Sequence, residues 1–119
     1  MINYILLFIS IGMAVIGQLL MKHGMRMIGF FPLSQLFSRF FSIIFNPFVF
    51  SGISMFALSA IVWLVVLSRF ELSFVYPMVS VGYVIVALAS MFFFHESITL
   101  VRWLGIGTII LGVFLISRS

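Results

Sequence analysis

The chain has 119 residues, of which 65% are hydrophobic and only 7% are charged, with a formal net charge of +4 and no cysteine. A soluble domain is about half apolar and about one quarter charged, and it could not bury this much apolar surface. The composition therefore excludes an ordinary soluble domain and thiol chemistry, and it predicts one membrane domain over residues 1–119. The cations form no basic stripe, so they indicate lipid headgroups rather than nucleic acid.

Four long apolar runs predict an all-α integral membrane protein with four transmembrane helices. A backbone in lipid must satisfy its own hydrogen bonds, and the runs lack the alternation typical of barrel strands. Each is close to the roughly 20 residues that cross a bilayer. The predicted spans are Tyr4–Met21, Phe48–Leu67, Ser73–Phe94 and Leu100–Ile116. No basic residue precedes the first run, so we expect a first span rather than a cleaved signal peptide.

Between the first and second spans lies Phe30–Phe45, in which polar residues recur at helical spacing and leave a phenylalanine-rich opposite face. This pattern predicts a short amphipathic helix in the membrane interface, with a loosely ordered loop as the alternative. The polar positions are Ser34, Gln35, Ser38, Arg39 and Ser42.

The cations also predict an orientation, because cytoplasmic loops carry the excess of Lys and Arg. Four of them belong to the first and third loops or their edges, and two lie on the other side. The first set is Lys22, Arg26, Arg39 and Arg102, and the second is Arg69 and Arg118. Loops one and three are therefore expected in the cytoplasm, although so small a bias leaves open dual insertion or orientation by a partner.

The first span contains one amide, Gln18, followed one helical turn later by Lys22 and then by Arg26. Gln18 has two interpretations: an interhelical hydrogen bond, or a cavity-lining group that meets a polar headgroup. The two cations are typical of side chains that reach the interface and set topology. The same pair at a helix end would also bind a phosphodiester.

The third span carries Pro77, which removes a backbone hydrogen bond and predicts a bend, with Gly82 a little over one turn later. Tyr76, Ser80 and Tyr83 fall on one helical face. Interfacial anchoring explains many membrane tyrosines, but Tyr83 is too deep for that. We therefore expect this face to line a path for cargo.

Glu96 follows the third span. Its carboxylate is expected to cap the fourth helix and to pair with Arg102 or His95, while contact with a cargo amine stays open. Glu71 and Arg69 are expected to form a solvated pair. The two acids and two histidines lack the spacing of a nucleophile with its base or of a metal cluster. We therefore predict no enzyme, no metal and no cofactor.

Four helices are few for a carrier, and no internal repeat supplies a second half, so a second chain is expected. Gly105, Thr108 and Gly112 form a small-residue stripe on the fourth span that would let helices approach closely. Glycine merely tolerated within a span is the alternative.

Several segments together resemble the drug/metabolite transporter superfamily, and in particular its four-span flippase subunits for aminoarabinose-phosphoundecaprenol, of the ArnE/ArnF type. The matching segments are GQLLMK at 17–22, WLVVL at 63–67, YPMVS at 76–80 and FHES before RWLGIGTIILGV. The resemblance extends over nearly the whole chain and is weakest in Phe30–Phe45. Related small multidrug exporters carry a proton-exchanging glutamate in the first span, where this chain has Ala14. The resemblance also implies pairing of two chains through the fourth span.

Residues and resemblance together predict a flippase, or flippase subunit, for a polyprenyl-phosphate-linked sugar in the bacterial inner membrane. The expected partners are membrane lipid, the glycolipid itself and a similar four-span chain, as a homodimer or heterodimer. The candidate substrate contacts are Gln18, Lys22, Arg26, Tyr76, Ser80, Tyr83 and Glu96. Two alternatives remain: a small multidrug or metabolite exporter with atypical coupling, and an accessory subunit that transports nothing alone.

Overall fold

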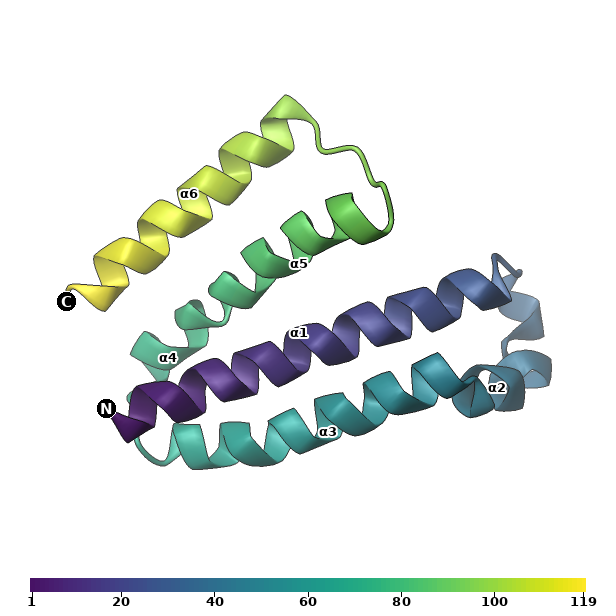
Figure 1. Ribbon diagram of the computed structural model, residues 1–119, viewed down its shortest axis with the longest axis horizontal. Helices are drawn as coiled ribbons and strands as arrows, with labels where there is room; N and C mark the ends of the chain where they lie inside the picture. The colour runs from purple at the N-terminus through teal and green to yellow at the C-terminus, as the bar shows by residue number, and fades with distance from the viewer.

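The computed structural model describes residues 1–119, and its regular elements are all helices. Four helical spans lie in a row in the order α3, α1, α4–α5 and α6 (Figure 1). Their bounds are α1 (Ile2–Ile28), α3 (Pro47–Leu67), α4 (Leu72–Met78) with α5 (Ser80–Phe93), and α6 (Leu100–Ser117). All four are long and apolar enough to cross a membrane. The predicted all-α fold with four spans is confirmed.

The first span is longer than predicted, because α1 continues beyond Met21 to Ile28. The sequence KHGMR therefore does not break the helix. Its lysine, methionine and arginine are good helix formers, and Gly24 is buried against α3. As a result, Lys22 and Arg26 belong to the last two turns of a helix and not to a loop.

Glycines set the close approach of α1 and α3. A Cβ atom at Gly17 would lie 2.8 Å from the carbonyl oxygen of Gly52, and one at Gly52 would lie 2.7 Å from that of Gly17. At Gly24, a Cβ atom would lie 2.8 Å from the backbone nitrogen of Val49. Only residues without a side chain fit this interface, as is common between membrane helices.

The α1–α3 pair is also held by a small core and one buried polar contact. The hydroxyl of Ser10 donates to the backbone carbonyl of Ser59 at 3.1 Å. Around this contact, the N-terminal half of α1 packs against the end of α3 and against α4. The core residues are Leu7, Ile11, Val15, Val66, Val75 and Met78.

The third span is interrupted at Val79, two residues after Pro77, where α4 ends and α5 begins. The turn is closed by shorter-range bonds, from Val79 N–H to the Tyr76 carbonyl and from Gly82 N–H to the Val79 carbonyl. Gly82 is buried, and a Cβ atom there would lie 3.1 Å from Cγ2 of Ile11. Gly82 therefore lets α5 approach α1 closely.

A short helix lies between the first two spans, as predicted, although it begins later than Phe30. A single 3₁₀ turn, η1 (Leu33–Gln35), leads into α2 (Leu36–Phe45). On its polar side, Arg39 Nε donates to Gln35 Oε1 at 3.1 Å. On the other side Phe37, Phe41 and Phe45 are mostly exposed, so an apolar stripe is free to meet lipid.

The N-terminus of α3 follows directly. Asn46 is its N-cap, and its side-chain oxygen accepts hydrogen bonds from Phe48 N–H at 3.0 Å and Val49 N–H at 3.2 Å. Pro47 stands at the first helical position, where no intrahelical bond is lost. The Asn-Pro pair thus ends α2 and starts the second span.

The last span, α6, is the most exposed, since only 6% of its most apolar window is buried. It packs against α4 and α5 and forms one end of the row (Figure 1). No atom of another segment lies within 4 Å of a Cβ built at Gly105 or Gly112. The small-residue stripe therefore has no partner within this chain.

Candidate functional site

A polar cavity of about 400 Å³ lies at one end of the bundle, between the C-terminal part of α1, the end of α5 and the start of α6. It brings together four residues that the sequence singles out from three separate segments. Its polar lining consists of Gln18, Lys22, Tyr83, Ser90, Glu96 and Arg102. The apolar lining consists of Leu19, Val86, Ala87, Phe94 and Ile98.

Gln18 is exposed to this cavity and makes no hydrogen bond with another residue of the chain. An amide carries two donors and an acceptor, and in an apolar span each needs a partner. Lys22 lies one turn further along α1 on the same cavity wall. The interhelical hydrogen bond considered from the sequence is absent within this chain, so these groups are free for a polar ligand.

The loop between α5 and α6 places Glu96 in the cavity. His95 has a φ of 53°, which a residue with a side chain seldom adopts, and this reverses the chain after Phe94. The backbone N–H of Glu96 then bonds the Ser90 carbonyl at 3.4 Å. The turn thus fixes the carboxylate against the cavity.

Glu96 does not cap the fourth helix, contrary to expectation. The N-cap is Thr99, whose hydroxyl accepts a hydrogen bond from Arg102 N–H at 3.2 Å. A short hydroxyl side chain next to the helix suits this role better than a longer acid three residues earlier. Glu96 and Arg102 line the same cavity, so the acid is available there to a ligand.

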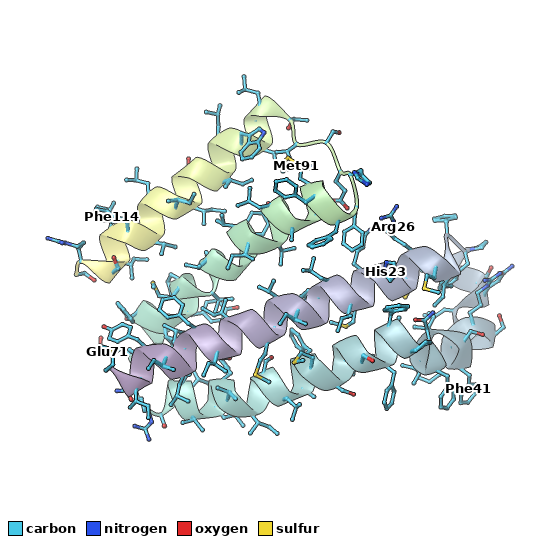
Figure 2. The ribbon with its side chains drawn as sticks, viewed as in Figure 1. His23, Arg26, Phe41, Glu71, Met91 and Phe114 are labelled. Carbon is cyan, nitrogen blue, oxygen red and sulfur yellow. The ribbon has the colours of Figure 1, made fainter.

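Arg26 lies at the rim of the cavity. Its guanidinium carbon is 5.1 Å from the centre of the Phe94 ring, which is part of the cavity wall. His23 packs edge-on against Phe48, with ring centres 4.5 Å apart, and faces the same region (Figure 2). A neighbouring hollow of about 470 Å³ is lined by Lys22, Arg26 and the following loop. The end of α1 therefore presents two cations, Lys22 and Arg26, to these two hollows.

Two candidate residues lie elsewhere. Tyr76 lines a mostly apolar cavity of about 290 Å³ near the middle of the bundle, together with Ala14 and Trp63. Ser80 is half-buried at the first residue of α5 and lines neither cavity. The predicted face of the third span is thus divided, with Tyr83 at the polar cavity and Tyr76 nearer the opposite end of the span.

Sequence reasoning missed Ser90 and did not assign Arg102 to the cavity. Ser90 is seven residues after Tyr83, which places both on one face of α5, and that spacing was the available signal. With these two residues the site offers two cations, one acid, one amide and two hydroxyls. Such a set can bind a phosphate and an amine at the same time.

The chain is similar to curated flippase subunits. It is 37% identical over 71 residues to a protein of Aeromonas hydrophila named "Probable 4-amino-4-deoxy-L-arabinose-phosphoundecaprenol flippase subunit ArnE", covering 60% of this chain and 62% of that one. An ArnE subunit of Pseudomonas fluorescens is 30% identical over 116 residues, covering 98% of this chain and 97% of its own. An ArnF subunit of Serratia proteamaculans is 36% identical over 114 residues, covering 92% and 88%.

With some relatives the match is partial: it spans 62% and 64% of the two Aeromonas ArnE proteins. No protein-family model and no solved structure matches the chain. Two matches are nearly full-length and cover 98% and 92% of this chain.

Proposed function

The chain belongs to the ArnE/ArnF family of flippase subunits, and we propose that it moves the head of a polyprenyl-phosphate-linked aminosugar across the bacterial inner membrane. One observation carries the proposal: Gln18, Lys22, Tyr83 and Glu96 converge on one polar cavity at the end of the spans. The relatives are named for a lipid that combines an amine, a sugar and a phosphate. The cavity has complementary groups for each.

Within this cavity the roles follow from chemistry. Lys22 and Arg102 would bind the phosphate, with Arg26 attracting it at the rim. Glu96 would bind the amine of the sugar, and Gln18 and Tyr83 would bind its hydroxyls. Only the head needs a polar route, because a polyprenyl tail is as apolar as the lipid around it.

The route continues from the cavity along two adjacent helices. On α1, Ala14 lies one turn before Gln18 and lines the apolar cavity beside Tyr76. On the third span, the break near Pro77 and the close approach at Gly82 would let this segment shift against α1. Ser80, next to the break, would meet the head as it passes.

A second four-span chain, identical or similar, completes the transporter in this proposal. The relatives are named as subunits, and α6 exposes most of its surface. Gly105, Thr108 and Gly112 would pack against the partner, since a small-residue stripe allows backbones to approach closely.

The orientation in this proposal places the polar cavity at the cytoplasmic surface. Lys22, Arg26, Arg39 and Arg102 all belong to this end of the bundle, and positive residues concentrate in the cytoplasm. The head would therefore enter from the cytoplasm, with loops one and three on that side.

The test is head-group translocation in vesicles that contain the chain and its partner. Gln18→Leu and Tyr83→Phe should each lower the rate about fivefold, because each removes about one hydrogen bond worth on the order of 1 kcal/mol. Gln35→Leu is the matched control, since Gln35 is the only other glutamine and lies on the interfacial segment. Normal rates for both cavity variants, with normal insertion, would remove these residues from the route.

The same vesicles separate the proposal from its rivals. A small multidrug exporter would release protons when hydrophobic cations are added, and we expect no release because Ala14 replaces the acid of such exporters. An accessory subunit would leave flipping unchanged in all cavity variants while loss of the whole chain abolished it.

A further inference from the structure

We propose a second head-group site at the opposite end of the bundle, in a cavity of about 460 Å³ between the start of α1, the α3–α4 loop and the end of α6. Its ligand class is an amine-bearing phosphodiester head group. Its polar lining consists of Tyr4, Arg69, Glu71, Ser73 and Ser119. The inference rests on the proposed function, because a head that enters at one surface must be released at the other.

The first argument is composition. The chain contains only two acids, and each lines one of the two polar cavities. Each acid is accompanied by an arginine, a tyrosine and a serine from different turns or segments. The second cavity thus repeats the residue types of Glu96, Arg102, Tyr83 and Ser90 in its own Glu71, Arg69, Tyr4 and Ser73. In a chain with 7% charged residues, this repetition indicates that both ends meet the same kind of head group.

The second argument is that both charges in this cavity remain available. Arg69 and Glu71 were expected to form a solvated pair, but Arg69 Nη1 instead donates to Asn3 Oδ1 at 3.1 Å. That bond uses one of five guanidinium donors and orients the rest. The carboxylate of Glu71 accepts no hydrogen bond from another side chain. A phosphate bound to Arg69 and an amine bound to Glu71 would therefore give each side chain a partner of opposite charge.

The third argument is rigidity. The rings of Tyr4 and Phe70 meet edge to face at 5.3 Å, and Phe70 stacks on Phe74 at 5.7 Å. These contacts tie the α3–α4 loop to the start of α1. The loop that carries Arg69 and Glu71 is thus held in place beside the cavity.

The fourth argument is position. Tyr4 and Lys22 stand near opposite ends of α1, and the helix between them rises about 27 Å, close to the thickness of the hydrocarbon core. Figure 2 shows Glu71 near the N-terminal end of α1, at the far end of the bundle from His23 and Arg26. The two cavities would therefore face opposite membrane surfaces.

The test measures lipid binding to the full chain with its partner, released from nanodiscs into native mass spectrometry. The probes are aminoarabinose-phosphoundecaprenol, undecaprenyl phosphate, which lacks the amine, and phosphatidylethanolamine, a phospholipid with an amine-bearing phosphodiester. A background with Lys22→Gln, Glu96→Gln and Arg102→Gln removes every charged residue from the lining of the first cavity. Into it we introduce Arg69→Gln or Glu71→Gln, with Arg118→Gln as the matched control, because Arg118 is at the same end but outside the cavity.

We expect the background protein to retain one bound aminosugar lipid. Arg69→Gln should weaken binding of the aminosugar and amine-free prenyl lipids roughly tenfold, whereas Glu71→Gln should weaken only the amine-bearing lipids. Arg118→Gln should change nothing. Glu71 is the stricter test, since replacing it breaks no hydrogen bond between side chains of the chain.

Two results would overturn the second site and leave the proposed function standing. Either the background protein binds no lipid at all, or it binds lipid equally well with and without Arg69→Gln and Glu71→Gln. Binding of phosphatidylethanolamine as tight as that of the aminosugar lipid, with the same dependence on Glu71, would support the site and identify bulk phospholipid as its source. If the unmodified protein binds phosphatidylethanolamine in this way and no prenyl lipid, the proposed function fails and the site remains.

Discussion

Replacement of Gly52 by alanine should separate α1 from α3. A Cβ atom at this position would lie 2.6 Å from Met21 Cγ, 2.7 Å from the Gly17 carbonyl oxygen and 2.8 Å from Met21 N. The methionine side chain can rotate away, but the two backbone atoms cannot. Because carbon needs about 3.5 Å from its neighbours, the helices must move apart by several tenths of an ångström.

The expected change in the free energy of unfolding of Gly52→Ala follows from two opposing effects. Alanine in place of a helix-interior glycine gains about 0.5–1 kcal/mol from backbone entropy, and overpacking costs about 1–3 kcal/mol. Gly12→Ala is the matched control on α1, because a Cβ atom there meets nothing within 4 Å. We therefore expect Gly12→Ala to be neutral or stabilising, and Gly52→Ala to be about 1–3 kcal/mol less stable than that control.

The assay is reversible unfolding, followed by circular dichroism, as sodium dodecyl sulfate is added to the protein in mild detergent micelles. The free energy of unfolding is compared between the two alanine variants and the unmodified chain. Equal stability of Gly52→Ala and Gly12→Ala would refute the reasoning, since it would mean that the α1–α3 interface can open at no cost. Loss of folding by Gly52→Ala alone would agree with it.

Three further predictions concern local contacts. Asn46→Ala should lower the unfolding free energy by about 1 kcal/mol in the same assay, because two N–H groups of α3 lose their acceptor; an unchanged value would argue against the cap. Ser10→Ala should cost less than about 1 kcal/mol, since its bond to the Ser59 carbonyl is typical of membrane hydrogen bonds, and a loss above about 2 kcal/mol would contradict this. His95→Gly should preserve aminosugar-lipid binding and His95→Val should weaken it several-fold, because a β-branched residue resists the positive φ that places Glu96; equal binding would show that the turn does not position the acid.

The spans were predictable from sequence because lipid imposes one requirement on every residue within them. Continuous apolar runs must be helices, so the second, third and fourth spans begin and end within one residue of expectation. The predicted end of the first span, Met21, was wrong because the polar residues Lys22, His23 and Arg26 are typical of a loop. Charge and polarity indicate where a helix meets water, and they do not indicate where its backbone stops.

The glycine-mediated helix contacts were less predictable from the sequence than the spans. Gly105 and Gly112 stood out by their spacing, yet Gly17 and Gly24 have the same seven-residue spacing and are the ones packed within the chain. Periodicity identifies a face that can approach another helix closely, but the identity of the neighbour depends on the arrangement of all four spans. Gly52, which completes the contact, stands alone in its segment and gives no periodic signal.

Four of the six polar residues that line the cavity were predicted from the sequence, but their convergence was not. Gln18, Tyr83 and Glu96 attracted attention singly, because polar groups in or near spans are costly and usually have a purpose. Their convergence depends on the left-handed turn at His95, which brings the acid back over the end of α5. A turn made by a histidine with positive φ has no reliable sequence signature.

The distribution of charge along the bundle bears on what drives transport. Ala14, which the resemblance to small multidrug exporters aligns with their proton-exchanging acid, lines the apolar cavity near mid-depth with Trp63 and Tyr76. Glu71 and Glu96 line cavities at opposite ends. On the proposed route, the head would leave one acid, pass only neutral groups and arrive at the other. An exchange of proton for substrate needs one titrating group that both occupy in turn, and no carboxylate lies on the middle of this route.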